Sequence, residues 1–422
     1  MTESRGKTVL IISQTFVPDP ASVGQHVADV AIEMARRGHP VHVLTSARGY
    51  ENPQMKYPPR ENLRGVDVRR LPLASFGKKS ILTRVIGTAA FMAQIFFRAL
   101  FTPRLGAIFF STSPPLVGLV GTTVAMLRRV PCAYWAMDLN PDQLIAMGKI
   151  KQRSMIARIL EAVNRWILRR SDLIIALDRF MADRLAQRDP KLRDKMLVLP
   201  PWPHEEHIAP GEAPSTNGVN PFRERHGLAG KFVVMYSGNH SPSNPLDTVL
   251  EAARELRDDD SIRFLFVGGG IGKPKVEAFI REHRLTHAMS LPYQPLSELK
   301  YSLSAADVHV VSLGQEMVGI IHPCKIYGAM AASRPVLFVG PKPSHITDLL
   351  DQHELGWHVA HGDVAGAVAV LRAMAAMSPD QMSAKGNRSR EVLQQLLSQQ
   401  HLCRAMCDRV EATLFGPAQP AP

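Results

Sequence analysis

One pattern recurs along the chain: a short apolar run, a turn, and then a segment in which apolar residues fall three or four positions apart. Such a pattern predicts buried strands joined by amphipathic helices, as in a parallel sheet covered on both faces. In the first half the apolar runs lie at 8–13, 41–44, 66–73, 107–111, 133–137, 173–177 and 196–199. A second series lies at 232–237, 262–267, 307–312 and 335–339. The sequence therefore predicts two doubly wound α/β domains.

The two series are separated by a stretch rich in Pro, Gly and polar residues, which is typical of a linker. We place an N-terminal Rossmann-like domain at 1–205, the linker at 206–230 and a C-terminal Rossmann-like domain at 231–386. Residues 387–415 are expected to be helices that pack back towards the first domain, and 416–422 a disordered tail. Two such domains that face each other leave a central cleft at the carboxyl ends of both sheets, where these folds bind ligands.

Charge is distributed unevenly between the halves. Residues 1–200 hold 30 Lys and Arg against 15 Asp and Glu, whereas residues 201–422 hold 20 against 23. No acidic residue occurs between Asp67 and Asp138. The first half is therefore expected to meet an anionic partner. A nucleic acid fits this charge poorly, because aromatic residues make up only 6% of the chain and no stacking platform or recognition helix is evident.

Two apolar stretches bear on a membrane. Residues 105–127 are uncharged, but Pro114 and Pro115 divide them, so we interpret them as a buried strand, turn and helix. Residues 77–104 have an apolar centre too short to cross a bilayer and basic flanks, as in a helix that lies in the membrane interface. The alternative is a solvated helix that packs on its own domain. The residues predicted to face the membrane are Lys78, Lys79, Arg84, Arg98 and Arg104.

The four cysteines form no CxxC pair, which favours a reducing compartment, and the N-terminal apolar run is too short for a signal peptide. We therefore expect a cytoplasmic protein that is peripheral on the cytoplasmic face of the inner membrane.

In each domain the first strand leads into a turn of small residues and then a helix, around Gly24 and around Gly238. Such turns let backbone N–H groups approach a phosphate, although an ordinary tight turn is the alternative. A third segment, 318–340, has Pro323 where a helix can start and Lys325 in the first turn. A lysine there opposes the helix dipole and favours a bound anion such as a diphosphate. The alternative is a solvated surface lysine.

Six segments in order along the two domains carry a family resemblance: ARRGHPVHVLTS, DLNPDQ, SGNHSPSNPLDTVLEAA, FLFVGGG, SAADVHVVSL and PCKIYGAMAASRPV. Over nearly all its length the chain resembles the family-four glycosyltransferases, which have the GT-B fold. It looks most like the subgroup that builds exopolysaccharide, capsule or O-antigen chains. The resemblance implies a sugar donor activated by a nucleotide, retention at the anomeric carbon, and no metal.

The resemblance also implies roles for individual residues. Gly24 would approach the donor diphosphate or the acceptor, and Lys325 would bind the diphosphate. Asp138 would activate or orient the acceptor hydroxyl, its alternative being a buried carboxylate that caps the following turn. The donor-binding set would comprise Gly24, Gly238, Asn239, His240, Gly268, Tyr293, Gln294, Glu316, Gly319 and His322.

The chain departs from the family at four positions. Asn239 and Asn244 stand where many relatives have an Arg and a Lys, and Ile320 and Gly328 stand where they have two glutamates. Glu316 is the acid that could replace the first glutamate, or it is a solvated loop residue. The phosphate charge would then rest largely on Lys325, assisted by His322 and helix N-termini.

The sequence thus predicts transfer of a sugar from a UDP- or GDP-sugar to a saccharide acceptor that is attached to a lipid, in cell-surface polysaccharide synthesis. It predicts no metal site and no cofactor beyond the nucleotide sugar. Two alternatives stay open: a nucleotide-sugar epimerase of the same fold, and a catalytically silent scaffold that binds a sugar nucleotide.

Overall fold

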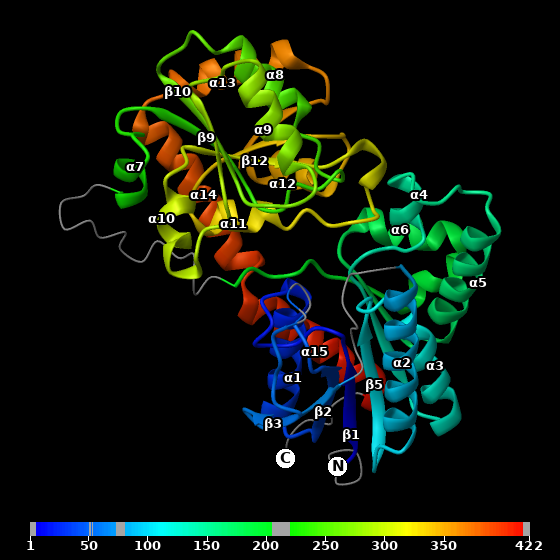
Figure 1. Ribbon diagram of the computed structural model, residues 1–422. Helices are drawn as coiled ribbons and strands as arrows, with labels where there is room; N and C mark the ends of the chain where they lie inside the picture. Colours follow the sequence, from blue (N-terminus) through cyan, green and yellow to red (C-terminus); the bar gives the residue numbers. More distant parts are fainter. Residues whose placement is uncertain (1–5, 50–51, 53, 73–80, 205–219, 417–422) are drawn as a thin grey trace. The chain divides into compact units, whose positions relative to one another are not determined.

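The computed structural model describes residues 6–49, 52, 54–72, 81–204 and 220–416, without the side chains of 81–86. These residues form two compact units (Figure 1). The first takes its residues from Met1–Pro201, Gly319–Ile321 and Gln400–Pro422, and the second from Trp202–Val318 and His322–Gln399.

An eight-stranded sheet forms the centre of the first unit, in the order β3-β4-β2-β1-β5-β6-β7-β8. Its strands are β1 (Thr8–Ile12), β2 (Val41–Ser46), β3 (Arg60–Leu63), β4 (Val66–Leu71), β5 (Leu105–Ser111), β6 (Cys132–Ala136), β7 (Leu173–Ala176) and β8 (Met196–Val198). All pairs are parallel except β3 with β4. Strands β1, β5, β6 and β7 are buried along their whole length, as their apolar runs predict.

Helices cover both faces of this sheet. They are α1 (Ser22–Arg36), α2 (Ile81–Leu100), α3 (Val117–Arg128), α4 (Asp142–Ala146), α5 (Met155–Arg170), α6 (Arg179–Arg188) and α15 (Gln399–Phe415). Helix α3 packs against α2 on one side and against α5 on the other (Figure 1). Right-handed crossovers from β4 to β5, β6 and β7 place these three helices on one face and α1 on the other.

Helix α15 returns to the first unit although it comes last in the chain. The guanidinium of Arg37, at the end of α1, contacts Asp408 at 2.7 Å and Glu411 at 2.5 Å. His39 binds Glu411 at 2.6 Å and stacks on Phe415. The chain at 387–415 is not one continuous helical segment of this unit, because α14 (Pro379–Leu396) packs against α11 and α12 in the second unit.

The second unit contains a six-stranded parallel sheet in the order β11-β10-β9-β12-β13-β14. The strands are β9 (Phe232–Ser237), β10 (Ile262–Val267), β11 (Ala288–Leu291), β12 (Val308–Ser312), β13 (Val336–Val339) and β14 (Gly356–Val359). Strand β9 has β10 on one side and β12 on the other, so the strand order reverses there. In open α/β sheets ligands bind beyond the carboxyl ends of the strands at such a reversal.

The helices of the second unit are α7 (Pro221–Arg225), α8 (Asp247–Glu255), α9 (Lys273–Glu282), α10 (Leu299–Ser304), α11 (Lys325–Ala331), α12 (His345–His353), α13 (Val364–Ala375) and α14. Helix α7 corrects the predicted linker of 206–230. Phe222 and Leu228 are fully buried in the core of this unit, against Val233 and Leu265. Residues 220–230 therefore belong to the second domain, and 205–219 lie outside the described residues.

Helix α3 differs from the buried helix predicted within 105–127. Its inner face is buried at Val117, Val120 and Val124, but Leu119 and Leu127 are exposed. Strands β3, β11 and β14 were not predicted, because none has a continuous apolar run.

Candidate functional site

Lys325 lies at the strand reversal of the second unit. It is the first residue of α11, and its ammonium donates a hydrogen bond to Asn244 Oδ1 at 3.1 Å. The same ammonium lies 5.4 Å from the centre of the Tyr236 ring, at the end of β9. Burial lowers the pKa of Lys325 from 10.5 to about 8. The ammonium thus contacts a neutral amide and an aromatic face, which leave its positive charge available to an anion.

Asn244 is fixed by a second hydrogen bond. Its Nδ2 donates to the carbonyl of Ser312 at 2.7 Å, at the end of β12. This contact orients the amide so that Oδ1 faces Lys325. The side chain of Asn244 therefore connects the loop after β9, the end of β12 and the start of α11.

The loop after β9 is shaped by close approaches of neighbouring atoms to three glycines. Gly238 has φ +135°, and a Cβ there would lie 2.7 Å from Lys325 Cε. Gly268, after β10, has φ +131°, and a Cβ there would lie 2.0 Å from the Gly238 carbonyl. A Cβ on Gly270 would lie 2.1 Å from Asn239 Oδ1. The Gly238 turn therefore packs directly against the glycine turn that follows β10, and Lys325 lies across the Gly238 turn.

His240 adds two backbone hydrogen bonds between the same two turns. Its backbone N–H donates to the carbonyl of Gly269 at 2.7 Å, and its carbonyl accepts from Gly272 at 2.8 Å. The imidazole is buried edge-on against Tyr236. Burial lowers the pKa of His240, so the ring is neutral at pH 7.

Tyr293 and Gln294 follow β11, beside the second glycine turn. Tyr293 is 58% exposed, and a Cβ on Gly269 would meet its ring at 2.8 Å. Gln294 donates from its side chain to the carbonyl of Pro292. Lys273 does not add a free cation here, because its ammonium donates to the carbonyls of Gly268 and Leu291, each at 2.7 Å.

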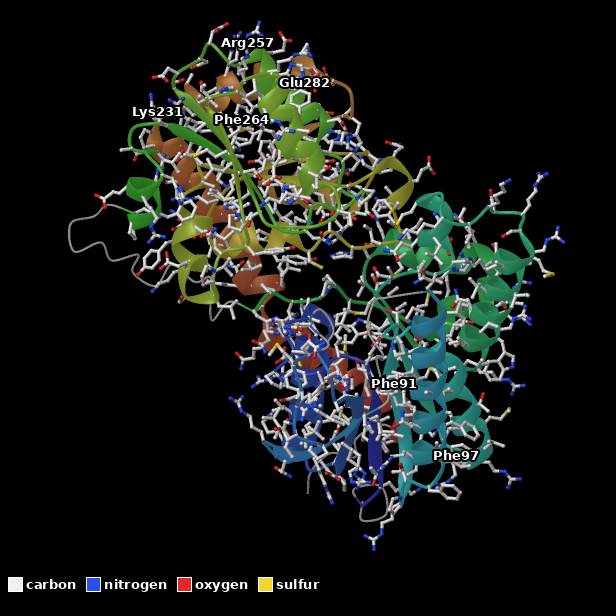
Figure 2. All side chains as sticks on the ribbon, viewed as in Figure 1. Phe91, Phe97, Lys231, Arg257, Phe264 and Glu282 are labelled. Carbon is white, nitrogen blue, oxygen red and sulfur yellow. The ribbon has the colours of Figure 1, made fainter. Side chains whose placement is uncertain are left out.

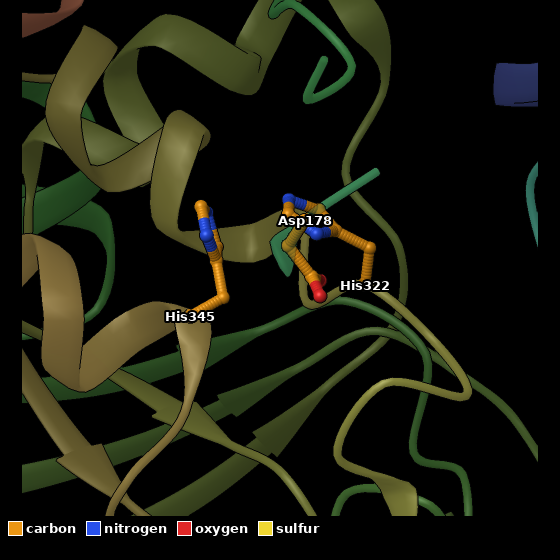
Figure 3. Close-up of side chains that lie close together, drawn as sticks. All are labelled: Asp178, His322 and His345. Carbon is orange, nitrogen blue, oxygen red and sulfur yellow. The ribbon is translucent and has the colours of Figure 1, made fainter. Parts of the chain in front are cut away.

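His322 lies beside Tyr327 and His345 in the second unit (Figure 3 shows both imidazoles). The Tyr327 hydroxyl is 2.6 Å from His322 Nε2 and 3.2 Å from His345 Nε2, and the two imidazole centres are 4.3 Å apart. Tyr327 comes two residues after Lys325 on α11. This packing fixes the chain just before Lys325.

Two further residues were predicted to bind the donor, Glu316 and Gly319. Glu316 is an exposed residue of the single turn Gln315–Met317 after β12. Gly319 clusters with the first unit, where a Cβ would lie 2.6 Å from the Phe180 carbonyl.

In the first unit, Gly24 allows α1 to approach the loop that follows β1. A Cβ on Gly24 would lie 2.9 Å from the backbone nitrogen of Phe16. One turn along α1, His26 is buried and meets Trp135 of β6 edge-on, with ring centres 6.1 Å apart. The start of α1 and the end of β6 are thereby brought together.

Asp138 and Asp142 both follow β6 but have opposite environments. The Asp142 carboxylate binds Arg184 Nε at 2.9 Å and also contacts Arg188, and hydrogen bonds and charge from these arginines lower its pKa despite burial. Burial raises the pKa of Asp138 to about 6. Asp142 therefore forms a structural ion pair with the two arginines. Of these two carboxylates, Asp138 is the one whose pKa lets it accept a proton near neutral pH.

The structure thus groups Lys325, Gly238, Asn239, His240 and Gly268 in one place. The sequence did not reveal that Asn244 and Tyr236 would hold the lysine. A polar residue in the loop after β9 was the signal for Asn244, but its role depends on β12 lying next to β9.

Comparison with known proteins shows the family of this chain. Residues 22–202 match the family described as glycosyl transferase 4-like domain, and residues 231–376 match glycosyl transferases group 1. The chain is a family-four glycosyltransferase.

The glycosyltransferase is 25% identical over 402 residues to WbjE of Pseudomonas aeruginosa, a protein assigned to the glycosyltransferases, covering 93% of this chain and 94% of WbjE. It is 23% identical over 341 residues to WcaI of Escherichia coli, which is assigned to colanic acid biosynthesis. This match covers 76% of this chain and 81% of WcaI. Among solved structures, HepE of Anabaena in complex with UDP and glucose superposes with a TM-score of 0.69 at 15% identity, covering 96% of this chain and all of HepE. This likeness confirms the GT-B fold.

Of the residues predicted to face a membrane, Arg98 and Arg104 of the glycosyltransferase are exposed. Lys78, Lys79 and the Arg84 side chain lie outside the described residues. Among the helices in the described part of the chain, none has the length and apolarity needed to span a bilayer.

Proposed function

We propose that this glycosyltransferase moves a sugar from a UDP- or GDP-sugar to a saccharide acceptor in cell-surface polysaccharide synthesis, with retention and without a metal. The observation that carries the donor assignment is the Lys325 ammonium, held over the Gly238 turn by a neutral amide. HepE, which has been solved with UDP-glucose, and WaaG, which acts in lipopolysaccharide biosynthesis, share the fold and support this choice of donor and pathway.

Breaking the bond between a sugar and its nucleotide places negative charge on the departing diphosphate. A preorganised cation stabilises that charge most where water is partly excluded, as it is around Lys325. The absence of a side chain at Gly238 lets Lys325 pack directly over this turn, and its absence at Gly268 lets the Gly238 carbonyl approach the next turn. Lys325 thus supplies the charge that a metal ion provides in other phosphate sites.

Asp138 is the residue that we assign to the acceptor. With a pKa near 6 it is ionised at pH 7 and can accept a hydrogen bond from a sugar hydroxyl or orient it. Its position after a buried strand gives it a fixed backbone.

The acceptor is proposed to be attached to a lipid, and the protein to be peripheral on the cytoplasmic face of the inner membrane. The support is the excess of basic residues in the first half, including the exposed Arg98 and Arg104.

The test is a thermal-shift screen of the full chain with UDP-, GDP- and ADP-sugars. A ligand at a hundredfold excess over its dissociation constant stabilises the folded state by about 2.7 kcal/mol. We expect a UDP- or GDP-sugar to raise the melting temperature of the wild type but not of Lys325→Ala. Lys342→Ala is the matched control, because Lys342 lies in the same unit and pairs with Asp351 at 2.8 Å. A shift unchanged in Lys325→Ala would refute the assignment of Lys325.

Product analysis then separates the alternatives. Transfer or slow hydrolysis releases a nucleoside diphosphate, and we expect Asp138→Asn to lose transfer while donor binding persists. An altered nucleotide sugar formed without any acceptor would identify an epimerase instead. Tight binding without turnover by the wild type, with suitable membrane acceptors present, would identify a scaffold.

A further inference from the structure

Exposed apolar side chains are concentrated on one layer of the first unit. Of the fifteen large apolar side chains that are exposed in the described part of the chain, nine lie between Phe97 and Ile159. They come from the end of α2, from α3 with its preceding residue, and from the start of α5, three helices that pack side by side. They are Phe97, Phe101, Leu116, Leu119, Met126, Leu127, Met155, Ile156 and Ile159. We call them the α2–α3–α5 surface.

Each of these helices buries one face inside the unit and exposes apolar side chains on another. On α2, Phe91 is fully buried whereas Phe97 is 59% exposed (Figure 2 labels both). On α3, the exposed positions 119, 126 and 127 lie along one side, and the exposed Leu116 directly precedes the helix. Apolar residues scattered singly on a surface need no explanation, but a patch on three adjacent helices indicates a partner.

Leu116 adds backbone strain to this surface. It precedes α3 with φ +68° and is 42% exposed. A bulky side chain rarely adopts the left-handed region, and such strain is typically retained where a site needs it. Here the strained backbone presents an apolar side chain to solvent.

The fully exposed charged residues along this part of the chain, from 97 to 160, are all basic. The exposed cations are Arg98, Arg104, Arg129, Lys149, Lys151, Arg153 and Arg158. From 97 to 161 the acidic residues are Asp138, Asp142 and Glu161; Asp142 is paired with two arginines, and Glu161 is half-buried on α5. An apolar patch with a rim of cations matches the hydrocarbon boundary and the anionic headgroups of a lipid bilayer.

We propose that the α2–α3–α5 surface docks on an anionic lipid bilayer, with α3 as its centre. This proposal rests on the proposed function, which places the acceptor on a lipid, and it adds α3 and α5 to the helix predicted from the sequence. A second copy of the chain is a poorer occupant, because two such rims would bring like charges together.

The test is sedimentation of the full chain with vesicles of phosphatidylcholine, with and without phosphatidylglycerol. We expect binding to the anionic vesicles only, weakened by salt. Leu127→Glu and Ile156→Glu should each reduce the partition coefficient about tenfold or more, because a buried apolar contact is lost and a like charge is introduced. Arg129→Gln should reduce it about fivefold. Ile271→Glu is the matched control, since Ile271 is 76% exposed in the second unit, and its binding should equal that of the wild type.

Three results would overturn the proposal: no binding to anionic vesicles, equal binding of Leu127→Glu and the wild type, or a dimer in sedimentation velocity that Leu127→Glu dissociates while vesicles are not bound. The thermal shift produced by the nucleotide sugar is measured on the same variants and should be unchanged. Failure of docking therefore leaves that shift intact, whereas failure of the proposed function removes it from the wild type.

Discussion

The affinity for a nucleotide sugar should fall as the pH rises from 7 to 9, because Lys325 loses its proton in that range. Burial lowers its pKa from 10.5 to about 8, which corresponds to a cost of about 3 kcal/mol for the buried ammonium in the free protein. The lysine is therefore mostly charged at pH 7 and mostly neutral at pH 9. A diphosphate beside it favours the charged form and raises the pKa again.

The size of the effect follows from this linkage. If the bound diphosphate restores an ordinary lysine pKa, binding above pH 8 takes up a proton, and the dissociation constant rises about tenfold between pH 7 and pH 9. Below pH 7 the affinity should be constant with respect to this group, since Lys325 is charged in both states.

Two substitutions test whether the pH dependence of donor binding comes from deprotonation of Lys325. Lys325→Arg keeps its charge throughout, so its affinity should vary little with pH beyond the ionisation of the nucleobase itself. Asn244→Asp places a carboxylate where Oδ1 is now 3.1 Å from the ammonium, which raises the pKa of Lys325 and neutralises it. This variant should bind the donor more weakly at pH 7 and lose the pH dependence.

Isothermal titration calorimetry measures these dissociation constants, and the proton uptake follows from repeating the titration in buffers of different ionisation enthalpy. The same pH profile for the wild type and Lys325→Arg, or a folded Asn244→Asp that binds as tightly as the wild type, would refute the role of Lys325 in this pH dependence.

Three further predictions concern single residues. Asp138→Asn should remove transfer but raise the stability at pH 7 by up to about 3 kcal/mol, because a buried carboxylate with its pKa raised to about 6 is replaced by a neutral amide; activity and urea unfolding check the two effects. In the wild type, transfer should decline as the pH falls through 6, which a pH–rate profile measures. Asp142→Ala should instead destabilise the first unit by about 3 kcal/mol, since it leaves two arginines unpaired, and the activity per folded molecule should persist. Gly238→Ala should weaken donor binding at least about tenfold in calorimetry, because its Cβ would lie 2.7 Å from Lys325 Cε.

Much of the fold could be predicted because its strands are buried on both faces. A run such as TVLII in β1 is apolar throughout, which a parallel sheet between two helical layers requires. Strand β3, RENL, has no such run, because it is the antiparallel edge of the sheet and is half exposed. The linker was placed too far along the chain, because composition does not show that Phe222 inserts into a core formed by distant strands.

The candidate site was predictable in its parts but not in its contacts. Lys325 and Gly238 stood out singly, one for a lysine at a helix start and the other for a glycine turn. Their contact depends on β12 lying beside β9, a pairing of segments far apart in the sequence. The exposed side of α3 was missed for a related reason: the helix is apolar on both sides, so no periodicity distinguishes the buried side from the exposed one.

The most direct test of the central claim is a crystal structure of the chain with the nucleotide sugar that stabilises it most in the thermal screen. We expect diphosphate oxygens within hydrogen-bond distance of Lys325 Nζ, beside the Gly238 turn. A diphosphate bound elsewhere, with the ammonium still donating only to Asn244, would contradict it.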